Sequence, residues 1–144
     1  MDPLRIDFET VSDEGARQFI INSLDNHNIA ATGVSNYHPL NLFLRSPRNE
    51  ILGGLLGYVW GGWLQVQHLW VAEQFRHRGE ATRLMDAAEA YAIERGCSAA
   101  TLDTHSFQAR PFYERRGYVV VGTLEGYPPG HTKYLLRKTL RPAA

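Results

Sequence analysis

The sequence predicts an α/β protein with a single domain, built on a mixed, mostly antiparallel sheet flanked by helices. Two apolar segments, residues 51–60 and 63–71, are separated only by Gly61-Gly62, which is typical of an antiparallel hairpin. A long amphipathic segment, residues 79–95, separates the second of them from another apolar segment at 99–104. Because a helix joins these last two strands, we expect them to run parallel through a right-handed crossover.

The N-terminal part of the chain predicts a strand, a helix and a second, shorter strand. Leu4, Ile6 and Phe8 alternate with polar residues, which predicts the first strand. Ser12 or Asp13 is expected to cap a helix whose apolar residues recur at helical spacing, at Ala16, Phe19, Ile20 and Leu24. The next elements are an irregular or helical connection over residues 26–40, a strand over 41–45 and a turn over 46–49.

The second half alternates helices and strands. The helix over residues 79–95 places Leu84, Met85, Ala88 and Ala92 on one side, and Gly96 is a natural C-terminal stop. A short helix is expected over residues 108–116, ended by Gly117. Two strands, over 118–122 and 132–138, then close the sheet on either side of a loop rich in Gly and Pro at 125–130.

The composition is that of an ordinary globular protein, with 44% hydrophobic and 21% charged residues. The length of 144 residues suits one domain, residues 1–144. Lys plus Arg and Asp plus Glu each total 15, so the formal net charge is zero. A nucleic-acid partner would call for a basic stripe, which the sequence lacks. Most arginines follow Val71, which favours a small anionic ligand instead.

The sequence gives no sign of a membrane partner or of export. No apolar segment approaches the roughly 20 residues needed to span a bilayer, and the N-terminus lacks the basic and apolar regions of a signal peptide. The one cysteine, Cys97, excludes an internal disulfide and is interpreted as buried packing. We therefore expect a cytoplasmic protein.

An arginine-rich loop, Arg76-His77-Arg78-Gly79-Glu80-Ala81, joins the strand at 63–71 to the long helix. It lacks the Gly-Lys-Ser/Thr ending of a Walker A loop and is not a G-x-G-x-x-G loop. Because the first N–H groups of a helix have no partners within it, this loop and the Thr82 hydroxyl can hold a phosphate. Gly79 allows close approach of the backbone to a ligand, and Ala81 avoids crowding it. The alternative interpretation is a basic surface loop that only caps the helix.

A second segment, residues 102–118, strengthens the phosphate interpretation. It contains Phe112-Tyr113-Glu114 shortly before Arg116-Gly117-Tyr118. Together with the R-x-x-G-x-A pattern of Arg76, Gly79 and Ala81, this segment resembles the GNAT family of N-acetyltransferases. The resemblance covers nearly the whole chain in element order and is specific over about residues 63–118.

The resemblance implies that acetyl-CoA binds as a cosubstrate, without a metal, and that an amine attacks it directly in a ternary complex. The parallel strands are expected to splay apart, with pantetheine in the wedge pairing with backbone groups of one strand. Tyr113 matches the family's tyrosine that protonates the departing thiolate, which suits a phenol with an ordinary pKa of about 10. The residues implied in cofactor binding are Leu69, Trp70, Val71, Arg76, His77, Arg78, Gly79, Glu80, Ala81, Thr82, Ser106 and Phe112.

The chain departs from the family pattern at three positions. Ser106 stands where many members have asparagine, so one contact to pantetheine or to the short helix is expected to differ. His77 replaces a frequent glycine. Glu80 puts a carboxylate beside the pyrophosphate site, so it must point outward or pair with an arginine such as Arg76 or Arg83.

The general base has several candidates. Many relatives use a glutamate on the strand before the loop, whereas this chain reads Gln65-Val66-Gln67-His68-Leu69 there. His68 is the preferred candidate, because imidazoles have an ordinary pKa of about 6.5 and strand alternation puts His68 on the face opposite Leu69. Asp103, His131 and a water relay are the alternatives, and a purely structural role for His68 is also open.

The acceptor is expected to be a small-molecule or peptide amine, bound among aromatic and polar side chains. The substrate-binding candidates are Tyr37, His38, Gln108, Tyr127 and His131, with Asn36, Trp60, Trp63 and the rest of the loop 126–131. Trp60 and Trp63 can equally pack on each other across their turn. A non-catalytic acyl-CoA-binding module and a different nucleotide-binding protein are the alternative functions, and a homodimer is an open alternative for assembly.

Overall fold

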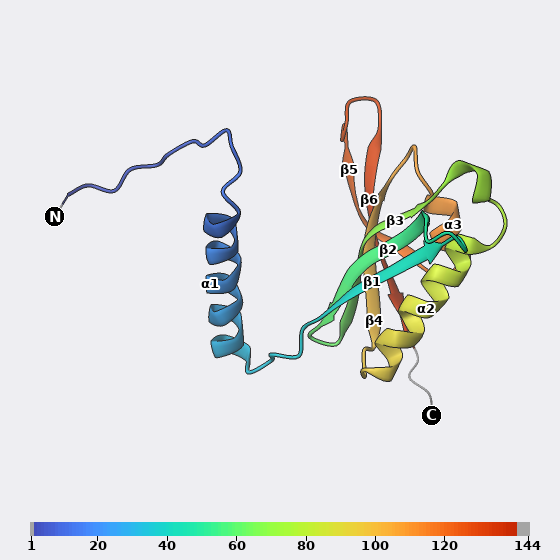
Figure 1. Ribbon diagram of the computed structural model, residues 1–144, viewed down its shortest axis with the longest axis horizontal. Helices are drawn as coiled ribbons and strands as arrows, with labels where there is room; N and C mark the ends of the chain where they lie inside the picture. The colour runs from blue at the N-terminus through green and yellow to red at the C-terminus, as the bar shows by residue number, and fades with distance from the viewer. Residues whose placement is uncertain (1, 141–144) are drawn as a thin grey trace. The chain divides into compact units, whose positions relative to one another are not determined.

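The computed structural model describes residues 2–140 of the chain (Figure 1). The chain falls into two compact units, one ending at Ser35 and one beginning at Asn36. The single-domain organisation therefore stays a prediction. In the part of the chain that the structure describes, no helix has both the length and the apolar character needed to cross a bilayer.

The first unit contains one helix, α1 (Glu14–Thr32). Its N-terminus confirms one of the two predicted caps, because the Asp13 carboxylate accepts a hydrogen bond from the Ala16 N–H at 3.0 Å. Gly33 ends the helix with a φ of 72°, in the left-handed region that glycine adopts readily. The helix therefore extends well into the predicted connection over residues 26–40.

The predicted first strand is wrong, since residues 2–9 form no regular secondary structure. The alternation of Leu4, Ile6 and Phe8 with polar residues shows only that a strand formed here would have one apolar and one polar face. A strand also needs a neighbour for its backbone N–H and C=O groups. The strands of the described chain all lie between residues 38 and 139.

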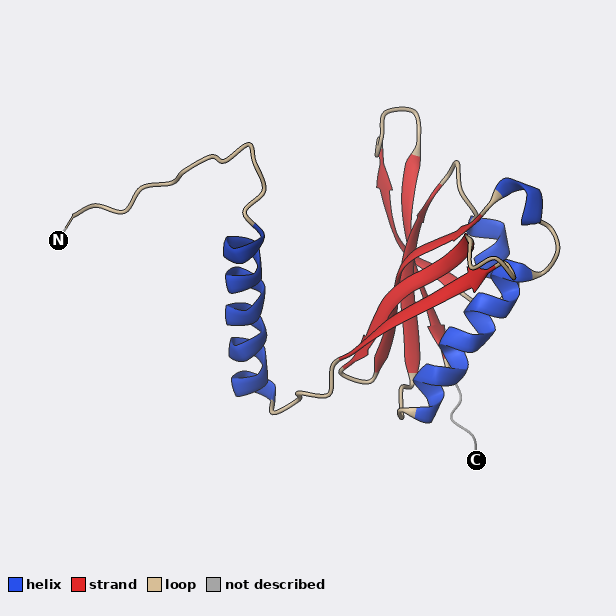
Figure 2. Ribbon diagram, viewed as in Figure 1, coloured by secondary structure: helices blue, strands red, loops and turns tan. Residues whose placement is uncertain are grey.

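Within residues 2–140, six strands form one sheet, drawn in red in Figure 2, and their order is β1-β2-β3-β4-β6-β5. β3 and β4 run parallel and all other neighbours run antiparallel, which confirms the predicted mixed sheet. β1 begins earlier and β5 ends later than predicted. The strands are β1 (His38–Arg45), β2 (Ile51–Trp60), β3 (Trp63–Val71), β4 (Ala99–His105), β5 (Val119–Glu125) and β6 (Thr132–Thr139).

The parallel pair separates before either strand ends. The last paired residues are Val66 and Leu102, although β3 continues to Val71 and β4 continues to His105. The C-terminal ends of the two strands therefore border an opening in the sheet.

A β-bulge in β3 accounts for this separation. Leu56 pairs with His68 and Gly57 pairs with Val66, which leaves Gln67 as an extra residue on β3. A bulge bends its strand and increases the local twist, so it directs the end of β3 away from β4. Gly57 lies opposite the bulge, where an added Cβ would collide with the backbone of β3. Glycine is therefore required at this position.

Helices α2 (Glu80–Glu94) and α3 (Arg110–Arg115) follow the ends of β3 and β4, with a short 3-10 helix, η1 (Glu73–Phe75), before α2. α2 packs against β1, β2 and β3. Its predicted apolar side is buried, at Leu84, Met85, Ala88 and Ala92. α3 is shorter than the predicted helix over residues 108–116.

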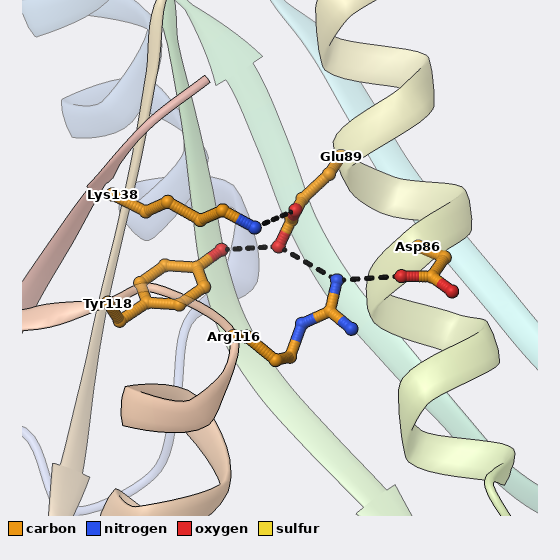
Figure 3. A network of polar contacts seen from close by, with 5 residues as sticks. All are labelled: Asp86, Glu89, Arg116, Tyr118 and Lys138. Carbon is orange, nitrogen blue, oxygen red and sulfur yellow. Dashed lines mark hydrogen bonds and ion pairs between the residues drawn. The ribbon is translucent and has the colours of Figure 1, made fainter. Parts of the chain in front are cut away.

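The buried side of α2 also carries a carboxylate, Glu89, which is only 7% exposed (Figure 3). Lys138 donates a hydrogen bond to it at 2.6 Å and the Tyr118 hydroxyl donates another at 2.9 Å. The Arg116 guanidinium lies 3.1 Å from the same carboxylate and also donates to Asp86 at 2.9 Å. Burial, and next the negative charge of Glu89, raise the pKa of Tyr118, so its hydroxyl stays protonated and remains a donor. The network ties α2 to β6 and to the segment between α3 and β5.

Replacing Glu89 by leucine should lower the free energy of unfolding by about 3 kcal/mol, because it leaves Arg116 and Lys138 without their shared counter-charge. Urea denaturation followed by tryptophan fluorescence measures the change. The matched control is Glu94→Leu, an exposed position on the same helix, which should stay within about 0.5 kcal/mol of the wild type. Equal losses in the two variants would contradict the role given to the network.

Candidate functional site

Two clefts open where β3 and β4 separate. The first, here called the loop cleft, has a volume of about 570 Å³. It is lined by Leu69, Trp70, Val71, Phe75, Arg76, His77, Gly79, Glu80, Ala81, Thr82, Ala109, Phe112, Tyr113 and Arg115. The second, here called the strand cleft, has a volume of about 840 Å³. It is lined by residues 66–71 and 102–105 and by Arg76, His77, Phe107, Gln108, Ala109 and Tyr113.

The loop cleft brings together the predicted cofactor-binding residues, with two exceptions. The Arg78 guanidinium lies over the ring of Phe75, 5.7 Å from its centroid. Ser106 lies in the loop after β4 and lines neither cleft.

The backbone of the β3–α2 loop is shaped by two residues in the left-handed region, His77 with a φ of 62° and Gly79 with a φ of 81°. Glycine adopts this region without steric cost, which explains why a glycine is frequent at the position of His77. Gly79 is the N-cap of α2, and no side chain caps the helix there. The first-turn N–H groups of α2 therefore lack partners within the helix, and the helix dipole makes this end of the cleft suit an anion.

The charged side chains of the loop are held in pairs or against the backbone. Glu80 accepts a hydrogen bond from Arg83 at 2.8 Å, which confirms one of the predicted arrangements for this carboxylate. The Arg76 side chain donates to the Val71 carbonyl oxygen at 2.8 Å. The negative charge of the Glu80 carboxylate is therefore partly neutralised by Arg83.

The end of β3 presents free edge positions to the opening. The Ala72 N–H donates to the Leu52 carbonyl at 2.8 Å, so the backbone groups of Ala72 point toward β2. Since backbone groups alternate in direction along an antiparallel strand, Leu69 and Val71 direct theirs away from β2. The opening between β3 and β4 is thus edged by backbone groups of these two residues.

Tyr113, on α3, lies where the two clefts meet and lines both of them. The residue is 7% exposed, with its ring against Phe112 and Tyr118 at centroid distances of 5.1 and 6.0 Å. Burial, followed by the negative charge of Asp103, raises the pKa of Tyr113 to about 12. The phenol is therefore protonated at neutral pH.

His68 and Asp103 face the strand cleft from its two opposite walls, β3 and β4. The nearest cation to Asp103 is Lys133, whose Nζ lies 3.9 Å from the carboxylate. Gln108 also lines this cleft, and its side-chain oxygen accepts a hydrogen bond from the His105 N–H at 2.8 Å. Two of the three candidate bases thus lie in one cleft with Tyr113.

Ser106 holds the loop after β4 to the first residue of β6. Its N–H donates to the Thr132 carbonyl at 2.8 Å, and its hydroxyl accepts from the Thr132 N–H at 3.1 Å. The same hydroxyl lies 3.3 Å from Nδ1 of His131. Ser106 therefore contacts the start of β6 and His131, and its role in cofactor binding stays a prediction.

Tyr127 and His131 line neither cleft but pack against rings that do. Tyr127 lies 5.6 Å from His105 between ring centroids, and His131 lies 5.0 Å from Phe107. These two predicted substrate-binding residues thus lie behind the residues that line the strand cleft.

The structure does not bring Tyr37 and His38 together with the clefts. His38 pairs with Val59 at the end of the sheet where the β2–β3 hairpin turns, and the clefts open at the opposite end of β3. Tyr37 packs against Tyr58, with ring centroids 5.2 Å apart. The hairpin residues Trp60 and Trp63 pair with each other at the same distant end. The register of β1 and β2, which the sequence does not reveal, decides this placement.

Three lining residues of the loop cleft were not predicted: Phe75, Ala109 and Arg115. Arg115 is three positions after Phe112 on a helix, so helical spacing places the two on one face. That spacing is a usable signal for Arg115. Phe75 and Ala109 lie outside the motifs, and no pattern marks them.

The chain is similar to known acetyltransferases over most of its length. The profile of the Acetyltransferase (GNAT) family matches residues 6–118. An acetyltransferase of Agrobacterium fabrum is 38% identical over 128 residues, which cover 89% of this chain and 93% of that protein. Blasticidin-S acetyltransferase of Streptomyces morookaense is 41% identical over 113 residues, which cover 76% of this chain and 83% of that protein.

Solved structures agree with the sequence comparison. One from Agrobacterium tumefaciens has 35% identity and a TM-score of 0.87, covering 94% of this chain and 99% of its own. An acetyltransferase from Bacillus cereus has 28% identity and a TM-score of 0.79, covering 93% of this chain and 98% of its own. The family profile spans both the β3–α2 loop and Tyr113. The chain therefore belongs to the GNAT family of acetyltransferases.

Proposed function

We propose that this chain is an N-acetyltransferase that moves the acetyl group of acetyl-CoA to a primary amine by direct attack in a ternary complex. The observation that carries the proposal is that the two clefts meet at one buried phenol, Tyr113. On one side lie helix N–H groups suited to a phosphate, and on the other lies a cleft with groups that accept a proton or attract an amine. Membership of the family and the names of the relatives support acetyl transfer.

In this proposal the loop cleft binds the pyrophosphate of acetyl-CoA. The first-turn N–H groups of α2 and the Thr82 hydroxyl donate to its oxygens, and the small side chain of Ala81 leaves room for it. The pairing of Glu80 with Arg83 supports this arrangement, because it reduces the repulsion between the carboxylate and the phosphates.

Backbone groups at the end of β3 then position the thioester. The pantetheine arm pairs with Leu69 and with the N–H of Val71, since Arg76 already occupies the Val71 carbonyl oxygen. N–H groups of this segment donate to the carbonyl oxygen of the thioester as it gains negative charge.

The chemical steps divide between His68 on β3 and Tyr113 on α3, which both line the strand cleft. The acceptor enters as an ammonium ion and gives a proton to His68, after which its nitrogen attacks the thioester carbonyl carbon. The carbon–sulfur bond breaks while the O–H of Tyr113 donates a hydrogen bond to the sulfur. The second proton of the nitrogen then passes through this phenol to the sulfur, so CoA leaves as the thiol and Tyr113 keeps a proton. Asp103 and a water relay remain the alternative bases, whereas His131 lies behind the cleft lining, against Ser106.

A small-molecule amine is the acceptor class that we favour over a peptide. The relative from Streptomyces morookaense is named for blasticidin-S, and it covers 76% of this chain at 41% identity. The experiment that tests the function is release of free thiol from acetyl-CoA with a panel of amines. Binding of CoA with no amine-dependent release across the panel would refute acetyl transfer and indicate an acyl-CoA-binding module.

Replacing Ala81 by aspartate should weaken CoA binding about tenfold or more, because a second carboxylate would face the phosphates. An acidic residue in the first turn is favourable to the helix, so the variant should fold. Isothermal titration calorimetry with CoA gives the dissociation constant. The matched control, Ala90→Asp, lies on the exposed side of the same helix and should bind CoA as the wild type does.

Replacing Tyr113 by phenylalanine should lower kcat about 100-fold, with little effect on the KM for acetyl-CoA, because it removes only the donated hydroxyl. Since the pKa of Tyr113 is raised to about 12 from its ordinary value of about 10, the phenol keeps its proton through neutral and mildly alkaline pH. The kcat of wild type and variant should therefore differ by a constant factor between pH 7 and about 9. Tyr91→Phe, outside both clefts, is the control, and full turnover of Tyr113→Phe would exclude the role.

Replacing His68 by glutamine should lower kcat/KM for the amine about 100-fold, because the amide of glutamine cannot accept a proton. The glutamine keeps a polar side chain of similar size, so acetyl-CoA binding should persist. His38→Gln is the matched control at the far end of the sheet and should leave kcat/KM unchanged. A wild-type kcat/KM in His68→Gln would pass the role of base to Asp103 or to water.

A further inference from the structure

The wall of the strand cleft that follows β4 carries stacked aromatic rings. His105 and Phe107 both line the cleft, with ring centroids 5.2 Å apart and planes inclined by only 22°. Tyr127 lies beside His105 at 5.6 Å, and His131 meets Phe107 edge-on at 5.0 Å. These four residues are here called the ring wall: His105 and Phe107 line the cleft, and Tyr127 and His131 lie behind them.

The ring wall is held in place yet open to solvent. The two hydrogen bonds between Ser106 and Thr132 join the loops that carry it. Phe107 is nevertheless 57% exposed and Tyr127 is 52% exposed. Rings that are fixed before a ligand arrives lose little entropy on binding, so such a surface favours a planar partner.

The same side of the cleft supplies a negative charge. Asp103 is the one carboxylate among the described residues that line the strand cleft. Its side chain is 45% exposed, and its distance of 3.9 Å from Lys133 is too long for a hydrogen bond. The carboxylate can therefore still accept hydrogen bonds from a bound cation.

Lys133 places a cation near both this carboxylate and one ring of the wall, that of Tyr127. Its Nζ lies 3.9 Å from Asp103 and 4.9 Å from the centroid of the Tyr127 ring. A carboxylate and an aromatic face both attract an ammonium ion in proteins. Arg76 also lines this cleft, and its side chain is held at the end of β3, where it donates to the Val71 carbonyl oxygen at 2.8 Å.

We propose that Asp103 and the ring wall bind the acceptor, and that the acceptor class is a primary amine attached to a planar, unsaturated ring. Asp103 attracts the ammonium group in competition with Lys133, and the ring of the acceptor lies against Phe107 and His105. This inference rests on the proposed function, because it names the substrate class of the same site. Asp103 acts here in recognition, and the proton still leaves through the base described above.

The charge is tested by titrating 2-phenylethylamine into the full chain saturated with CoA, followed by calorimetry. Asp103→Asn should weaken binding about tenfold, since it removes a charged acceptor of hydrogen bonds. Lys133→Met should tighten binding about threefold, because it removes the competing cation. If Asp103 served only to pair with Lys133, the two variants would shift the affinity in the same direction or leave it within twofold, and either result overturns the proposal.

The ring is tested by comparing 2-phenylethylamine with hexylamine, which has the same charge and a similar apolar size. The wild type should bind the aromatic amine about fivefold more tightly, and Phe107→Leu should remove that preference. Phe43→Leu, which removes an exposed ring on β1, is the matched control and should keep it. Equal affinities in the wild type, or no binding of either amine, would overturn the proposal.

Thiol release from acetyl-CoA separates this inference from acetyl transfer itself. If the protein binds the aromatic amine more tightly but releases no thiol, the proposed recognition site stands and the proposed acetyl transfer is refuted. Thiol release at equal rates for both amines would retain the transfer and refute the recognition site. If Asp103→Asn lowers kcat and leaves the KM for 2-phenylethylamine unchanged, Asp103 is the base and its role in recognition is lost.

Discussion

The Glu89 carboxylate fixes the two walls of the loop cleft relative to each other. It lies on α2, whose first turn borders the cleft, and it accepts hydrogen bonds from Tyr118 and Lys138. Arg116, which completes the set, directly follows the helix that carries Tyr113. A buried carboxylate without such partners would be strongly unfavourable. The native arrangement of the elements is therefore the one that keeps all three partners in contact with Glu89. Any shift of α2 against α3 would separate charged groups that have little access to water.

The opening between the walls has a separate, backbone origin. The extra residue at Gln67 turns β3 away from β4, and Gly57 supplies the space that this requires on β2. As a result, the backbone groups of Leu69 and Val71 have no strand beside them. The bulge thus makes the space that a ligand can enter, while the network around Glu89 sets its width. These two features act on different elements, so a change in one need not alter the other.

Local pattern was enough to predict the elements that lie near the site. The glycine pair at 61–62, the helix after Gly79 and the crossover to β4 are all recognisable from the spacing of residues that are close in the sequence. Long-range pairing was not predictable in this way. Glu89 and Lys138 are 49 residues apart, and nothing in the sequence marks them as partners. The same limit misplaced Tyr37 and His38, since their distance from the clefts depends on the register of β1 against β2.

The charge of Asp103 bears on how Tyr113 can act. With a pKa of about 12, this phenol is a weaker acid than a thiol, whose ordinary pKa is about 8.5. At equilibrium the proton therefore stays on Tyr113 and does not pass to a free thiolate. In the proposed reaction Tyr113 must therefore act in the transition state, where the hydrogen bond from its O–H to the sulfur strengthens as negative charge develops on the sulfur. Asp103 favours that role, because a nearby carboxylate opposes ionisation of the phenol while it attracts a cationic acceptor.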